Sequence, residues 1–234
     1  MLTMAFDTST RAASVAVGDS DRLIGEMMTD IKLKHSERLM FLCDDLLRNL
    51  GMKIGDIELF AVTAGPGSFT GLRIAMAAVK GLAQPKDIPI APVSSLECCA
   101  LGQNASPGDI ICPMFDAQRS SVYAAFFRED GGRAERLTED SVRDIGELAD
   151  EIKASGLRTV ICGDGVYRFR EMLGTIPNAV IASPARLLPK ASSLIAPAVS
   201  MYEEGKCVSY RDVMPVYLRR PQAEEAREMR EAGC

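Results

Sequence analysis

The residues best placed to bind an anion lie in a glycine-rich stretch at positions 64–73, Ala-Gly-Pro-Gly-Ser-Phe-Thr-Gly-Leu-Arg. An apolar run at 59–63 with the bulk of a buried strand precedes it, and a helical pattern at 70–83 follows it. Glycines allow close backbone approach, and the N–H groups at a helix N-terminus attract anions. We therefore expect either weak nucleotide or anion binding, or a structural turn that packs the helix against a sheet. The candidate binding residues are Asp7, Ser9, Gly65, Gly67, Ser68 and Gly71.

The stretch differs from the two common nucleotide-binding loops. Leu72 and Arg73 stand where a Walker loop has Lys followed by Ser or Thr. The last glycine comes one residue late for the G-x-G-x-x-G dinucleotide fingerprint. Spacing alone therefore does not identify a phosphate site.

Two aspartates and one histidine are the other residues that can do chemistry. Asp7 and Asp116 each end an expected strand, so they can hold a magnesium nucleotide in a cleft or cap the turns that follow. His35 is the only histidine, which excludes His-pair metal sites and makes a Ser-His-Asp triad improbable. We expect no catalytic residue, no metal and no cofactor.

Composition narrows the class of protein. The chain has 234 residues, 47% of them hydrophobic and 25% charged, as in ordinary globular proteins. Its net charge of −5 argues against broad binding of nucleic acid. Seven cysteines without C-x-x-C spacing and the lack of a membrane-length apolar run predict a cytoplasmic protein with no membrane contact.

The same order of elements is expected twice along the chain. Three strands, a helix, a strand and a second helix are expected in residues 2–83 and again in 110–173, separated by a turn-rich segment at 104–109. The duplicated βββαβα unit predicts two α/β lobes, 1–104 and 105–234, with a cleft between them. A mostly charged helix at about 221–232 either lies on the surface or packs back on the first lobe. Strands are expected at 2–6, 14–17, 23–28, 59–63, 88–93, 110–115, 122–127 and 159–162, and the third strand of the second unit turns back at 131–132 toward Leu137. An extended piece is expected at 215–220, and helices at 36–50, 70–83, 95–101, 145–154, 167–173 and 191–204.

Two helices of the first lobe carry more apolar residues than one covered face requires. The helix at 70–83 is charged only at Arg73 and Lys80, whereas a helix covering one sheet normally shows a polar face. The helix at 36–50 has a similar excess. We expect the two to form a partner interface, unless the second lobe or the terminal helix covers them. The predicted interface residues are Leu39, Met40, Cys43, Leu47, Leu72, Ala75, Met76, Ala78, Val79 and Leu82.

Four motifs in this order resemble the bacterial TsaB family of tRNA threonylcarbamoyladenosine biosynthesis proteins, which is also described as a glycoprotease-like or M22 peptidase homologue. They are Asp-Thr-Ser-Thr at 7–10, His-Ser-Glu-Arg-Leu at 35–39, the glycine stretch at 65–73 and Val-Ser-Ser-Leu-Glu at 93–97. The second half is more loosely similar, through the residues at 116–119, 163–165 and 215–219.

The resemblance implies a two-lobed fold of the actin, Hsp70 and sugar-kinase type, which is ribonuclease H-like. It implies a non-catalytic subunit that binds and activates TsaD, the paralogue that transfers threonylcarbamoyl to the adenosine next to the anticodon. TsaE, an ATPase, would join the pair, tRNA would be reached only through the complex, and the chain alone would form a homodimer.

One difference from the catalytic paralogue supports this role. The paralogue carries a His-x-x-x-His metal motif, whereas here Leu39 follows His35 four residues later. The missing ligand counts against peptidase activity. The alternative is a stand-alone ATP-dependent phosphotransferase or carbamoyltransferase that uses the interlobe cleft.

Overall fold

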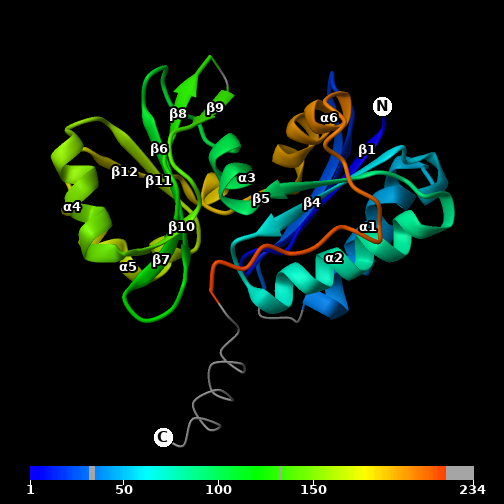
Figure 1. Cartoon of the computed structure of the whole chain (residues 1–234), viewed down its shortest axis with the longest axis horizontal. Helices are drawn as coiled ribbons and strands as arrows, with labels where there is room; N and C mark the ends of the chain where they lie inside the picture. Colours follow the sequence, from blue (N-terminus) through cyan, green and yellow to red (C-terminus); the bar gives the residue numbers. More distant parts are fainter. Residues whose placement is uncertain (32–34, 132, 220–234) are drawn as a thin grey trace, which may run out of the picture.

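The structure is a computed structural model of the chain, which describes residues 1–31, 35–131 and 133–219 (Figure 1). It shows two α/β lobes, each built around its own sheet. The helix expected at about 221–232 lies outside the described residues. Within them, no helix is both long enough and apolar enough to cross a membrane.

The first lobe has a sheet in the order β3-β2-β1-β4-β5. The β1–β2 and β2–β3 pairs are antiparallel, and the β1–β4 and β4–β5 pairs are parallel. Its elements are β1 (Thr3–Asp7), β2 (Ala13–Gly18), β3 (Leu23–Thr29), α1 (His35–Leu50), η1 (Ile54–Asp56), β4 (Leu59–Gly65), α2 (Phe69–Ala83), η2 (Gln84–Lys86) and β5 (Ile90–Ser94).

The second lobe repeats this arrangement in the order β10-β7-β6-β11-β12, again with two antiparallel pairs followed by two parallel pairs. The repeat confirms the duplicated βββαβα unit and the predicted actin, Hsp70 and sugar-kinase-like fold. The elements are β6 (Ile110–Asp116), β7 (Ser121–Ala124), β8 (Phe127–Asp130), β9 (Arg133–Arg136), β10 (Ser141–Asp144), α4 (Ile145–Ser155), β11 (Thr159–Cys162), α5 (Gly165–Leu173), β12 (Ala179–Ile181) and η3 (Pro184–Arg186).

Short strands in the second lobe account for the differences from the predicted elements. The single strand expected at 122–127 is divided into β7, which pairs with β10, and β8, which pairs with β9. Strand β9 lies where the chain was expected to turn back toward Leu137. The sequence analysis missed β10 and β12, because their three or four residues are too few to show an alternating pattern.

The two lobes exchange their last helices. Helix α3 (Ser95–Leu101) follows the first sheet but packs mainly on the second, where Leu96 and Cys99 meet Phe115 and Cys162, while its Cys98 still packs with the first sheet. Conversely, η4 (Ala191–Leu194) and α6 (Ile195–Glu203) follow the second sheet but pack on the first, against small residues such as Ala91. The predicted division at residue 104 therefore assigns residues 191–203 to the wrong sheet. An apolar pattern shows that a helix is covered, and not which sheet covers it.

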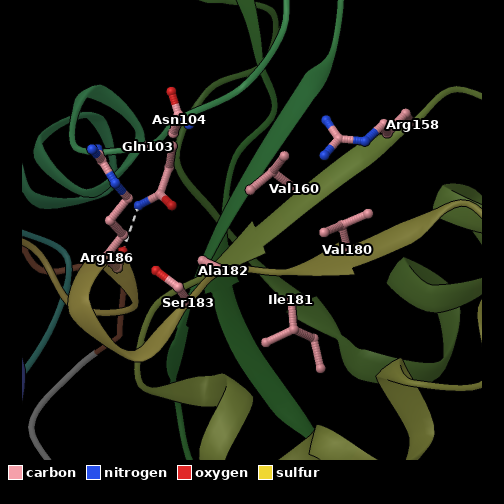
Figure 2. A pocket seen from close by; sticks show the side chains of 9 residues that line it. All are labelled: Gln103, Asn104, Arg158, Val160, Val180, Ile181, Ala182, Ser183 and Arg186. Carbon is pink, nitrogen blue, oxygen red and sulfur yellow. Dashed lines mark hydrogen bonds between the residues drawn. The ribbon is translucent and has the colours of Figure 1, made fainter.

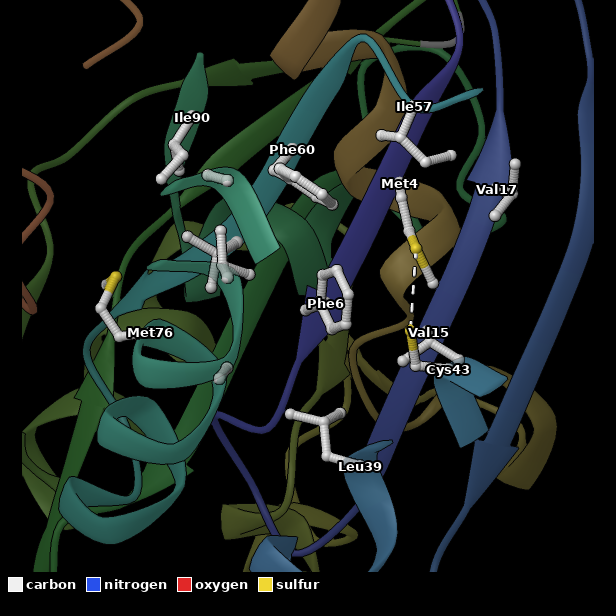
Figure 3. Packing of buried hydrophobic residues seen from close by; sticks show 14 of the residues in the cluster. Met4, Phe6, Val15, Val17, Leu39, Cys43, Ile57, Phe60, Met76 and Ile90 are labelled. Carbon is white, nitrogen blue, oxygen red and sulfur yellow. Dashed lines mark hydrogen bonds between the residues drawn. The ribbon is translucent and has the colours of Figure 1, made fainter. Parts of the chain in front are cut away.

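Helices α1 and α2 cover the other face of the first sheet (Figure 3). Phe6 from β1 and Phe60 from β4 are fully buried, with ring centroids 6.2 Å apart. Ser68 caps α2 by accepting a hydrogen bond from the Gly71 N–H, and Gly51 ends α1 in a left-handed conformation (φ 66°). The glycine-rich stretch is thereby placed at the carboxyl end of β4, facing the end of β1.

Candidate functional site

The glycine-rich loop packs directly on the turn that follows β1. A Cβ atom at Gly71 would lie 1.9 Å from the Thr8 carbonyl oxygen, and one at Gly67 would lie 2.3 Å from that of Ser9. The Ser68 N–H donates to the Ser9 carbonyl (2.7 Å), and the Thr8 hydroxyl donates to the Gly71 carbonyl (2.7 Å). These glycines are required because any side chain would separate the two backbones.

Several N–H groups of the loop already have protein acceptors. The Gly65 N–H donates to the Ser95 hydroxyl (3.1 Å), and the Gly71 N–H donates to the Ser68 hydroxyl (3.2 Å). With the Ser68 N–H held by Ser9, three of the donors that an anion would need are used within the chain. Of the two alternatives, the geometry favours a structural turn over an anion site. Anion binding at the loop stays a prediction.

Asp7 lies fully buried behind this loop. Its Oδ1 accepts hydrogen bonds from the Ser9 N–H (3.1 Å) and the Ser9 hydroxyl (2.6 Å). Its Oδ2 and the hydroxyl of Thr63 are buried, and neither forms a hydrogen bond of normal length among the described residues. Burial raises the pKa of Asp7 more than the nearby Ser9 and Thr63 hydroxyls lower it. Asp7 and Ser9 therefore form one hydrogen-bonded turn, as the capping interpretation expects.

Asp116 holds the matching place at the end of β6, but in a different environment. Its side chain is 38% exposed and pairs with Arg168 (3.1 Å). The neighbouring Asp164 accepts a hydrogen bond from the Asp116 N–H, and burial raises the pKa of Asp164 to about 6. Because one aspartate is buried and the other is paired with an arginine at the surface, the two carboxylates do not form a symmetric magnesium site.

His35 begins α1 with its Nε2 atom 3.0 Å from the Thr10 carbonyl oxygen. Leu39, one turn later, is only 1% exposed and packs in the core of the first lobe. No group of three or more His, Cys, Asp or Glu side chains gathers as a metal site in the described part of the chain. The position that would supply a second histidine ligand is thus an apolar core position.

Residues 213–219, which we call the strap, contact the glycine loop of the first lobe and reach the second lobe. The Val216 N–H donates to the Ala64 carbonyl (2.7 Å), and the Arg73 guanidinium stacks on Phe69 and donates to the Tyr217 hydroxyl (2.9 Å). Arg219 reaches the second lobe through the Ala117 carbonyl and the Ser121 hydroxyl. Figure 1 shows the strap, in orange, running along β4 and α2 toward the second lobe.

Comparisons with known proteins decide the family. The family model of TsaD, described as tRNA N6-adenosine threonylcarbamoyltransferase, matches residues 29–226. The tRNA threonylcarbamoyladenosine biosynthesis protein TsaB of Bacillus subtilis is 30% identical over 226 residues, which is 96% of each chain. The chain belongs to the TsaB family. TsaB of Escherichia coli is 30% identical over 94% of this chain and 95% of its own.

Solved structures agree. A crystal structure from Pseudomonas aeruginosa, described as an uncharacterized protein with similarity to peptidase YEAZ, matches with a TM-score of 0.80 at 30% identity. It covers 93% of this chain and 99% of that one. The family places this TsaB-family chain in tRNA threonylcarbamoyladenosine biosynthesis.

Most residues predicted for the partner interface lie instead in the core of the chain itself, which corrects the sequence analysis. The sheet covers one side of α2, and α1 packs beside it, so that the apolar excess is satisfied within the first lobe. The buried residues are Leu39, Cys43, Leu47, Leu72, Ala75, Met76 and Val79. Ala78 and Leu82 are half-buried at the edge of this core.

An exposed apolar face nevertheless remains on α1. Met40 is 45% exposed, as predicted for a contact residue, and Phe41 beside it is 67% exposed. On α2, a Cβ atom at Gly81 would meet nothing within 4 Å, and Ala77 is exposed. The sequence analysis missed Phe41, although its place between the core residues of the helix put a large aromatic on the outer face.

Proposed function

We propose that this TsaB-family chain is a non-catalytic subunit that binds and activates a TsaD-type catalytic paralogue, together with a TsaE-type ATPase. Membership of the family supports the pathway, which is threonylcarbamoyladenosine formation next to the anticodon of tRNA. The observation that carries the subunit role is the exposed pair Met40 and Phe41 on α1. A solvent-exposed phenylalanine beside a second large apolar residue is typical of a surface that a partner covers.

The site residues support a non-catalytic role. His35 is engaged with the Thr10 carbonyl, and the position of the missing second ligand, Leu39, is buried among apolar side chains. The glycine loop uses several of its N–H groups for internal hydrogen bonds. The chain therefore offers an aromatic contact surface more readily than a complete set of catalytic groups.

The α1 surface suits a partner with a similar helix. The paralogue shares the family model that matches this chain, so it has an equivalent first-lobe helix that can pack against Met40 and Phe41. A second copy of the chain would use the same surface when the paralogue is absent, giving a homodimer. A net charge of −5 disfavours direct binding of tRNA by the chain alone, so tRNA would be contacted through the complex. The complex would act in the cytoplasm.

Reconstitution tests the proposal. Threonylcarbamoyladenosine on tRNA is measured with the TsaD-type and TsaE-type proteins, with and without this chain. We expect modified tRNA only when the chain is present, and strongly reduced yield with Phe41→Glu but not with Tyr202→Glu, which alters an exposed aromatic on α6. Equal yield without the chain would overturn the proposal.

The alternative, a stand-alone ATP-dependent transferase, is tested on the chain alone. We expect neither stoichiometric zinc or iron by metal analysis nor appreciable phosphate release from ATP. Phosphate release that survives purification and is lost in Asp7→Ala would favour the stand-alone enzyme.

A further inference from the structure

A cavity of about 190 Å3 lies on the second sheet, beyond the carboxyl end of α3 (Figure 2). Its floor is formed by aliphatic side chains of β11 and β12, among them Val160 and Val180, and polar side chains form its walls. It is separate from the glycine loop and from the α1 surface. The lining residues are Gln103, Asn104, Arg158, Val160, Val180, Ile181, Ala182, Ser183 and Arg186.

The cavity arises because the two lobes are covered unequally. On the first sheet, η4 and α6 extend over β1, β4 and β5, and residues such as Ala91 and Val93 are buried beneath them. On the second sheet, the corresponding cover is α3, which has only seven residues and ends at Leu101. It covers Phe115 and Cys162 but stops short of β12, where Val180 is left 40% exposed.

Gln103 presents a fixed hydrogen-bond acceptor to this cavity. Its Nε2 atom donates to two carbonyl oxygens, those of Cys99 (2.8 Å) and Arg186 (2.8 Å). Rotating the amide would bring its oxygen against both carbonyls, so the orientation is determined. The Oε1 atom is buried and has no hydrogen-bond partner among the described residues, and Figure 2 shows it turned toward Val160. A buried acceptor of this kind favours a ligand that donates a hydrogen bond.

Two arginines stand at the rim of the cavity: the charge of Arg158 is balanced by Asp109, whereas Arg186 has no carboxylate partner among the described residues. Arg158 pairs through Nη1 with Asp109, and Arg186 donates through Nη1 to the Gly102 carbonyl (3.0 Å). These contacts hold the guanidinium groups at the rim and engage one nitrogen of each. None of the lining residues is acidic, which disfavours an ammonium ligand and favours an anionic one.

These features together select the chemistry of the ligand. The aliphatic floor suits the apolar face of a ring, and the Gln103 oxygen suits an amino group on that ring. The guanidinium nitrogens that Arg158 and Arg186 do not use in the contacts above suit an anion attached to the ring. A volume of about 190 Å3 is below the range of about 300–1,000 Å3 for pockets that hold drug-sized ligands, so only one ring system fits. We propose that the cavity binds one unpaired nucleotide, with its base on Val160 and Val180 and its phosphate at Arg158. The nucleotide is either a free mononucleotide or part of a single-stranded RNA, and the proposal does not depend on the function proposed above.

The test is an NMR titration of the full isotope-labelled chain with AMP. We expect saturable shifts confined to residues near 103–104, 158–160 and 180–186. Purine riboside monophosphate, which lacks the amino group, should bind at least tenfold more weakly, because the Gln103 acceptor stays unpaired. Inorganic phosphate alone should produce no saturable shift of the floor residues.

Two glutamate substitutions test the position of the base, one on the cavity floor and one at a control site. Val180→Glu places a carboxylate under the base at an exposed edge-strand position, and it should weaken AMP binding at least tenfold without unfolding the chain. Leu23→Glu, at a 51% exposed position on the edge strand β3 of the other sheet, should leave binding unchanged. Absence of saturable shifts with AMP, equal binding by the Val180→Glu variant, equal binding of purine riboside monophosphate, or shifts at the glycine loop instead would each overturn the proposal.

The source of the nucleotide is distinguished by comparing AMP with a trinucleotide of adenylate. Tenfold tighter binding of the trinucleotide at the same residues would support a single-stranded RNA. Equal affinity for both would support a free mononucleotide.

Discussion

Replacing Phe41 by alanine is the sharpest test of the partner surface. The side chain is 67% exposed on α1, so its removal takes little from the core of the free chain. Surface changes of this kind usually alter the free energy of unfolding by about 0.5 kcal/mol or less. Ala78→Glu on α2 is a less clean variant, because Ala78 packs partly against the core cluster and a carboxylate there would also disturb folding.

The expected effect on association follows from the exposed area. A phenylalanine that becomes fully buried loses at least about 150 Å2 of accessible surface, of which two-thirds, about 100 Å2, is still exposed in the free chain. At about 25 cal/mol per Å2, burial of this area by a partner stabilises the complex by about 2.5 kcal/mol. Since each 1.4 kcal/mol corresponds to about tenfold in the dissociation constant, Phe41→Ala should weaken association by about 50–100-fold.

The assay is sedimentation velocity or mass photometry of the chain with and without the TsaD-type paralogue. Circular dichroism and thermal unfolding first establish that the variant folds like the parent. Tyr202→Ala is the matched control, because Tyr202 is a 47% exposed aromatic on α6, which packs on the opposite face of the first sheet. If the Phe41→Ala protein associates as tightly as the Tyr202→Ala protein, the contact surface lies elsewhere and the reasoning is wrong.

Other predictions concern stability. Gly71→Ala should lower the free energy of unfolding by more than about 2 kcal/mol, since its Cβ would lie 1.9 Å from the Thr8 carbonyl oxygen, whereas Gly81→Ala in the same helix has open space and should raise it by about 0.5–1 kcal/mol. Urea unfolding of both variants compares them directly, and equal losses would contradict the close-approach argument. Burial raises the pKa of Asp164 from 3.8 to about 6, so the folded chain favours the protonated carboxyl group. Its contribution to the free energy of unfolding is therefore present below about pH 4, and about 3 kcal/mol of it is lost as the pH rises through 6. Asp164→Asn should therefore raise the melting temperature at pH 7.5 but not at pH 4, and an equal rise at both values would refute this.

The sequence by itself determined the order of the elements and the local chemistry of the glycine loop. Strand, turn and helix at 59–83 follow from an apolar run, a cluster of glycines and the cap Ser68, all of which act between residues close in the chain. The same holds for α3, whose cap Ser94 accepts from the N–H of Glu97, three residues later in the chain. The repeated order of elements was enough to predict a duplicated fold, because each unit has the same alternation of strands and helices.

The tertiary structure alone decided what covers each apolar face. The pattern on α2 required cover on two sides, and the structure supplies both within the lobe, through the sheet and α1, so that Leu72 and Val79 are buried while Phe41 stays exposed. It also decided that α3 and α6 exchange sheets, and that α3 is too short to cover Val180. Periodicity records only that a side chain is apolar and on which face it lies. Burial depends on residues far away in the chain, as with Gln103 and Arg186, whose hydrogen bond shapes the wall of the cavity.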